Sequence, residues 1–127
     1  MQNDLSARLG ALRHALETLR IPLAESEYQL HELIAAALHD GGFVVRHEAP
    51  LAPRCRVDFL VDGVGIEVKR GKPDRLRLLE QCRRYLSQDA LEALVIVVDT
   101  RVSLPDTICG KPVVVIGLNR LWGIALP

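Results

Sequence analysis

The sequence predicts an α/β domain, because segments with the periodicity of helices alternate with short segments that have the pattern of strands. Residues 56–69 have the pattern of a β-hairpin, and residues 94–98 and 113–116 are continuous apolar runs typical of strands buried on both faces. The chain has 127 residues, of which 49% are hydrophobic and 25% are charged. This length and composition favour one soluble, globular domain with a substantial core.

The first helix is predicted over residues 4–20 and ends before Pro22. Its leucines are spaced by four and three residues in turn, as in a coiled-coil seam, and they are Leu5, Leu9, Leu12, Leu16 and Leu19. Two interpretations stay open. In the first, residues 1–22 form a unit that makes a homodimer through Leu9, Leu12 and Leu16. In the second, this helix packs on the chain's own domain, residues 23–127.

A second helix is predicted over residues 26–40. Ser26 and Gln29, three residues apart, have the pattern of a capping box at its start, and Gly41 and Gly42 end it. Its expected apolar face consists of Leu30, Leu33, Ile34, Ala37 and Leu38. A first strand is then expected over residues 43–48, followed by a loop that the prolines at 50 and 53 break.

The hairpin over residues 56–69 turns at Asp62-Gly63, a pair that tolerates positive φ at little steric cost. Side chains of a strand alternate between the two faces of a sheet. The alternation therefore predicts that Asp58, Glu67 and Lys69 meet on one face, where apolar side chains usually lie. Two carboxylates and an ammonium group in that place indicate a functional site.

A third helix is predicted from Asp74 to about Gln88, with an apolar face that consists of Leu76, Leu79, Cys82 and Leu86. Residues 69–84 contain seven basic and two acidic residues, although the whole chain has a formal net charge of zero. This local positive charge is expected where a phosphodiester backbone is held. The tail over residues 118–126, which contains Trp122, is expected to close the core.

Asp58, followed on the next strand by Glu67-x-Lys69, resembles the signature of the PD-(D/E)XK nuclease superfamily, with Val57 in place of its proline. In the next helix, Gln81 and Tyr85 resemble the Gln-x-x-x-Tyr element of the exonuclease branch of that superfamily. The resemblance covers about residues 26–99. It implies a restriction-endonuclease-like αβββαβ core with a mixed central sheet, to which the first helix is an addition.

The resemblance also implies an enzyme, a Mg²⁺-dependent nuclease in which Mn²⁺ can replace Mg²⁺. Asp58 and Glu67 offer the carboxylate oxygens that Mg²⁺ prefers, and the backbone carbonyl of Val68 offers a further oxygen. Lys69 is placed to activate or position the attacking water and to stabilise charge on the phosphate. The role implied for Gln81 is to orient that water or the scissile strand.

In the superfamily, the helix ahead of the hairpin brings one more glutamate to the metal. Glu27 is the preferred candidate, because its Glu-x-x-Leu-x-x-Leu-Ile context resembles that of the superfamily's Holliday junction resolvases. Glu32 is the alternative, but it lies off the apolar face of the predicted helix. A glutamate in the first turn is also favoured simply by the helix dipole.

The basic stretch and the resemblance together predict DNA as the partner, and RNA stays open. The predicted contacts are Arg70, Lys72, Arg75, Arg77, Arg84 and Tyr85. The alternative function is an inactive nuclease-like domain that serves as a DNA-binding or assembly module. The presence of Asp58, Glu67 and Lys69 together favours the enzyme.

A membrane protein is not expected, because no apolar run approaches the roughly 20 residues that span a bilayer and no signal-peptide pattern is present. Cys55, Cys82 and Cys109 share no Cys-x-x-Cys spacing, which favours reduced thiols in the cytoplasm. Zinc is not expected either. His31 and His39 would be separated by roughly 80° around a helix, and no cysteine pair accompanies them.

Overall fold

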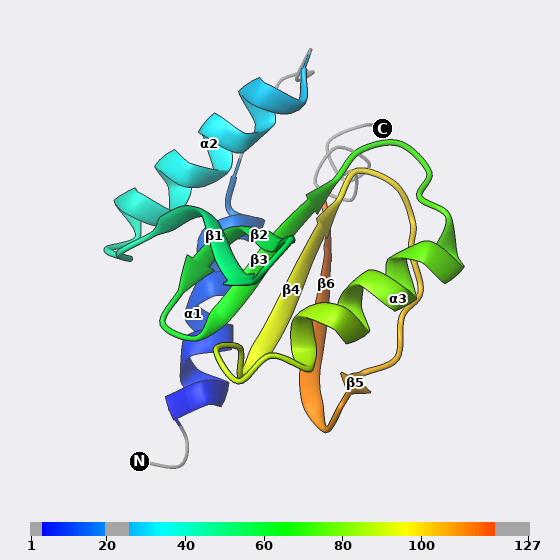
Figure 1. The fold of residues 1–127 in the computed structure, drawn as a ribbon. Coiled ribbons are helices and arrows are strands. Elements are labelled where there is room, and N and C mark those ends of the chain that lie inside the picture. Colours follow the sequence, from blue (N-terminus) through cyan, green and yellow to red (C-terminus); the bar gives the residue numbers. More distant parts are fainter. Residues whose placement is uncertain (1–3, 20–25, 119–127) are drawn as a thin grey trace.

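The computed structural model describes residues 4–19 and 26–118, which form three helices and a six-stranded sheet (Figure 1). The strand order is β1-β2-β3-β4-β6-β5. Antiparallel pairs join β1, β2 and β3, parallel pairs join β3, β4 and β6, and β5 is antiparallel to β6. The predicted α/β class is therefore confirmed, and the sheet is mixed.

The helices are α1 (Asp4–Glu17), α2 (Glu27–Asp40) and α3 (Arg75–Leu86). The strands are β1 (Arg46–Ala52), β2 (Cys55–Val61), β3 (Val64–Lys69), β4 (Ala93–Val98), β5 (Thr107–Ile108) and β6 (Lys111–Gly117). Helices α1 and α2 pack on one face of the sheet and α3 packs on the other (Figure 1). The sheet thus separates two apolar clusters. All six residues of β4 are buried, as the continuous apolar run predicts.

Helix α1 packs on the core of its own chain. Leu12 and Leu16 are completely buried in the same cluster as Ile34 of α2 and Ile116 of β6, and Leu9 is half-buried against that cluster. Burial within the chain accounts for the leucine spacing, which is the second of the two interpretations. The spacing therefore no longer argues for a homodimer seam, because two of its three leucines have no exposed surface.

Helix α2 begins with the predicted capping box. The Gln29 N–H donates to Ser26 Oγ at 3.1 Å, and the Ser26 N–H donates to Gln29 Oε1 at 3.2 Å. These two bonds satisfy amide groups that a helix start otherwise leaves without partners. The buried residues of the helix, Leu30, Ile34 and Leu38, belong to the predicted apolar face.

The hairpin turn is also as predicted. Asp62 has a φ of 46° and Gly63 has a φ of 80°, and positive φ at both central residues is the geometry of a two-residue type I′ turn. Arg8 of α1 holds this turn in place, because its guanidinium donates to the Asp62 carbonyl and lies 3.2 Å from the Glu92 carboxylate. The first helix thereby braces the hairpin that carries the candidate site.

Two predicted details are wrong. Strand β1 runs from Arg46 to Ala52, so Pro50 lies inside it rather than in a loop. An edge strand can contain proline because one of its sides has no partner strand, and the register of β1 shifts beside Pro50. In α3, Leu76 is 71% exposed rather than part of the apolar face. The buried stripe of α3 consists of Leu78, Cys82, Tyr85 and Leu86.

No helix in the described part of the chain is long and apolar enough to cross a membrane. Cys55 and Cys82 are buried, Cys109 is exposed, and all three are free thiols. Leu118 is buried beside the α1 leucines. The rest of the tail predicted to close the core, with Trp122, lies outside the described residues.

Candidate functional site

The site forms where strands β2 and β3 separate. Their paired register runs from Val61↔Val64 to Phe59↔Ile66 and ends there. Beyond it, the Asp58 N–H donates to Glu67 Oε1 at 3.1 Å, and the Val68 N–H donates to Asp58 Oδ2 at 2.8 Å. The two carboxylates thus take the place of strand carbonyls as acceptors. This exchange holds Asp58 and Glu67 across the gap between the strands.

Helix α3 closes one side of this gap. Gln81 Nε2 donates to Glu67 Oε2 at 3.3 Å and to the Tyr85 hydroxyl at 2.9 Å. Lys69 Nζ lies 3.4 Å from the same Glu67 oxygen. The structure therefore brings together Asp58, Glu67, Lys69, Gln81 and Tyr85, all of which the sequence placed at the site.

Helix α2 closes the other side, and it contributes a residue that the sequence analysis missed. His31 Nε2 lies 3.7 Å from Asp58 Oδ2 and 3.6 Å from Glu27 Oε2. This nitrogen is buried and has no hydrogen-bond partner among the described residues. In the sequence, His31 stands out only with His39 and His47 as a potential zinc ligand, and zinc is not expected. Its position four residues after Glu27, at the border of the apolar face, is the feature of the sequence that could have indicated its place at the site.

The two candidate glutamates of α2 lie differently. Glu27 approaches the site through His31, one turn further along the same side of the helix. Glu32 interacts instead with Tyr28, whose pKa it raises. The geometry thus favours Glu27 as the carboxylate nearer to Asp58, although its side chain is 65% exposed.

Glu67 has the most unusual electrostatic environment of the site. It is the one buried charged residue in the described part of the chain. Burial and the nearby Asp58 carboxylate raise the pKa of Glu67 to about 7, an effect that Lys69 only partly offsets. Burial also raises the pKa of Asp58, against the opposing effects of the Val68 N–H, His31 and Lys69. The positive groups around Asp58 and Glu67 therefore do not fully offset the cost of burying two negative charges side by side.

The donor atoms suit a hard divalent cation, since Asp58 and Glu67 offer oxygens and an added positive charge would relieve their repulsion. Within residues 4–19 and 26–118, however, no group of three or more His, Cys, Asp or Glu side chains is arranged to hold a metal ion. Asp58 and Glu67 are only two side chains, so they fall below that number. Mg²⁺ is commonly bound through one or two carboxylates while it keeps several waters, so the pair fits such an ion.

The structure places the predicted nucleic-acid contacts in different surroundings. Arg77 and Arg84 lie four residues before and three residues after Gln81, so they share its side of α3 and flank the site. Arg70 instead lies 3.3 Å from Asp99, and the Arg75 Nε–H donates to the Ser103 carbonyl at 3.0 Å. Lys72 is exposed, and Tyr85 is buried beneath Gln81.

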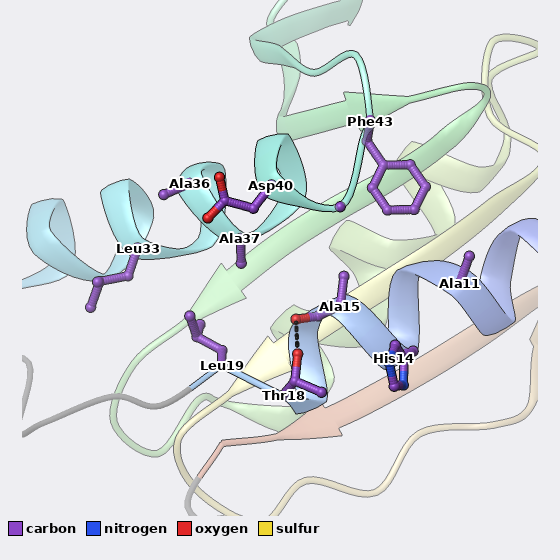
Figure 2. A pocket seen from close by; sticks show the side chains of 11 residues that line it. Ala11, His14, Ala15, Thr18, Leu19, Leu33, Ala36, Ala37, Asp40 and Phe43 are labelled. Atoms are coloured by element: carbon purple, nitrogen blue, oxygen red, sulfur yellow. Dashed lines mark hydrogen bonds between the residues drawn. The ribbon is translucent and has the colours of Figure 1, made fainter.

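A groove of about 610 Å³ lies between α1 and α2 (Figure 2), and His31 is not among the residues that line it. Its lining is mostly small and apolar, and includes Ala11, Ala15, Leu33, Ala37 and Phe43. The Thr18 hydroxyl in this groove donates to the Ala15 carbonyl at 3.0 Å. His14 and Asp40 are its titratable residues, and Figure 2 shows them on different helices and not directed at each other. The groove therefore offers no evident catalytic group.

Comparisons of the chain with protein-family models, with curated proteins and with solved structures gave no match. Any function assigned to the site therefore rests on the geometry described above. That geometry consists of the Asp58 and Glu67 carboxylates, each of which accepts a backbone N–H across the gap, with the Lys69 ammonium and the Gln81 amide beside Glu67.

Proposed function

We propose that this chain is a metal-dependent nuclease that hydrolyses DNA phosphodiester bonds, with a restriction-endonuclease-like core of the PD-(D/E)XK type. The observation that carries the proposal is the pair of Asp58 and Glu67 carboxylates held across the separated strands, with Lys69 Nζ 3.4 Å from Glu67. The order α2, β1, β2, β3, α3, β4 also agrees with the αβββαβ core that the sequence resemblance implies.

Each residue has a distinct part in this proposal. Asp58 and Glu67, with the Val68 carbonyl, hold Mg²⁺ or Mn²⁺, and Glu27 assists them. The bound cation supplies a Lewis acid and a water of lowered pKa. Lys69 stabilises the negative charge that develops on the phosphate, because its ammonium group is fixed beside Glu67 before the reaction begins.

Gln81 and His31 act as positioning residues. Gln81 fixes the orientation of Glu67, because its amide bridges the Glu67 carboxylate and the Tyr85 hydroxyl. His31 Nε2 lies 3.6 Å from Glu27 and 3.7 Å from Asp58, so it is placed to orient either carboxylate. Arg77 and Arg84 attract the phosphates of the DNA on either side of the scissile bond.

The test combines cation binding with cleavage. Mn²⁺ or Mg²⁺ should raise the melting temperature of the wild-type protein, because a ligand that binds only the folded state stabilises it. Asp58→Asn and Glu67→Gln should abolish this rise and the cleavage of labelled single-stranded, duplex, flap and junction DNA. Glu17→Gln is the matched control, since the exposed Glu17 carboxylate pairs with Arg13 in α1, away from the site.

Cleavage that survives Asp58→Asn at the wild-type rate would contradict the proposal. A wild-type protein that binds DNA but cleaves none of these substrates would instead favour the alternative function, a nuclease-like DNA-binding or assembly module. The flanking positions of Arg77 and Arg84 agree with DNA binding in either case.

A further inference from the structure

An exposed aromatic ring lies on α2, the helix that brings His31 to the candidate site. Tyr28 is 71% exposed, and only Val44 and Leu76 are comparably exposed among the large hydrophobic residues of the described chain. The chain is poor in aromatic residues, with two tyrosines in all, and the other one, Tyr85, is buried under Gln81. An exposed ring in this position has no role in the core, so its surroundings indicate what it contacts.

Tyr28 lies in the first turn of α2, directly after Glu27 and three residues before His31. His31 reaches to within 3.7 Å of Asp58, so the first two turns of α2 form one wall of the site. Glu32, one turn further along, interacts with the Tyr28 hydroxyl. The ring itself stays open to solvent.

The opposite wall of the site carries positive charge. Arg77 and Arg84 share the side of α3 that holds Gln81 against Glu67. The carboxylates between these two helices are largely covered, because the Asp58 side chain is 23% exposed and the Glu67 side chain is 7% exposed. A substrate that reaches the carboxylates therefore passes between the arginines of α3 and the first two turns of α2, which carry Tyr28.

Proteins that bind single-stranded nucleic acid combine a positively charged groove for the backbone with aromatic rings on which bases stack. A base within a duplex already stacks on its neighbours and offers no free face to such a ring. We infer that Tyr28 stacks on an unpaired base next to the scissile phosphate, so that the substrate is single-stranded DNA. This inference deepens the proposed nuclease function and rests on it.

The experiment measures binding without cleavage. Fluorescence anisotropy in EDTA gives the Kd of a labelled single-stranded oligonucleotide and of the duplex with the same sequence. Tyr28→Ala should weaken binding of the single strand by about 5-fold to about 150-fold, the loss expected for one base stack. Tyr28→Phe, which keeps the ring, and Val44→Ala, which removes another exposed side chain, should bind the single strand as the wild type does.

The duplex should be bound equally by the wild type and by Tyr28→Ala. An unchanged Kd of Tyr28→Ala for the single strand would overturn the inference, and so would an equal loss for both DNA forms. A wild-type protein that binds neither form would also overturn it. Binding of the single strand that depends on the Tyr28 ring would support the stacking site even if the protein cleaves nothing in Mn²⁺. The absence of cleavage would then contradict the nuclease proposal alone.

Discussion

Glu67 shows what its environment does to a single carboxylate. Its pKa rises from 4.5 to about 7, because burial and Asp58 disfavour the charged form. The folded state then holds this proton more tightly than the unfolded state does. Its contribution to stability is therefore complete below about pH 4.5 and is lost as the pH rises through about 7.

This difference predicts the effect of Glu67→Gln on stability in EDTA. The wild-type free energy of unfolding should fall between about pH 4.5 and about pH 7, and the variant should lack that part of the fall. Across this range the wild type should lose roughly 3 kcal/mol more stability than the variant does. Urea unfolding at a series of pH values measures the effect. Parallel pH profiles of the two proteins would contradict the assigned environment of Glu67.

Lys69 allows a second prediction at a single residue. Lys69→Ala should slow cleavage by about 10²–10³-fold, because one preorganised electrostatic donor is typically worth this much. DNA binding should persist, since Arg77 and Arg84 remain in place. Single-turnover cleavage and anisotropy measure the two effects. Arg13→Ala is the control, because it removes an exposed cation of α1 that pairs with Glu17 and lies outside the site. A Lys69→Ala protein that cuts at the wild-type rate would remove Lys69 from the mechanism.

Helix α3 divides its arginines between two sides, and this division can be tested. Arg77 and Arg84 share the side of Gln81, whereas Arg83 lies next to Arg84 in sequence but points to a different side. Replacing both Arg77 and Arg84 by alanine should lower the slope of log Kd against log salt by about 0.7 for each lost contact with single-stranded DNA. Arg83→Ala should leave the slope unchanged. Equal effects of the two changes would indicate a general attraction by charge.

The elements that local sequence determines were predictable. The capping box of α2 and the Asp62-Gly63 turn each depend on neighbouring residues, so their sequence patterns define them. The bounds of β1 depend instead on its pairing with β2 and on its place at the sheet edge, which local sequence does not reveal. The same limit applies to Leu76, because the packing of Leu78 decides which side of α3 is buried.

The candidate site shows the same division. Strand alternation predicted that Asp58, Glu67 and Lys69 meet on one face of the sheet. The structure instead brings them together across the gap between β2 and β3, with Asp58 toward α2 and Glu67 toward α3. The sequence did not reveal that β2 and β3 separate at this point, because the separation depends on how both strands pair with their other neighbours. His31 was missed for a similar reason, since its contact with Asp58 joins two elements far apart in sequence.

The whole molecule places its site at the junction of three layers. The sheet separates one cluster under α1 and α2 from another under α3, and the gap between β2 and β3 gives both helical layers access to the carboxylates. His31 enters from one layer and Gln81 from the other. The geometry of the site therefore depends on both cores, so substitutions in the α1 core should disturb the site through the fold.

The last prediction concerns that core and decides between the two interpretations of the leucine seam. Leu12 and Leu16 are completely buried within their own chain, so Leu12→Ala and Leu16→Ala should each lower the free energy of unfolding by about 2–5 kcal/mol. Arg13→Ala is the control, because it removes only an exposed ion pair with Glu17, a pair of a kind worth about 0.3–0.5 kcal/mol.

Urea unfolding at several protein concentrations separates packing within the chain from association between chains. If the leucines pack within one chain, the loss of stability should be the same at every concentration, because folding involves no partner. If they held two chains together, the wild-type midpoint would rise with concentration. The leucine variants would then also lower the mass measured by light scattering. A concentration-dependent midpoint would thus indicate that Leu12 and Leu16 lie in a dimer interface and would contradict their placement in the core.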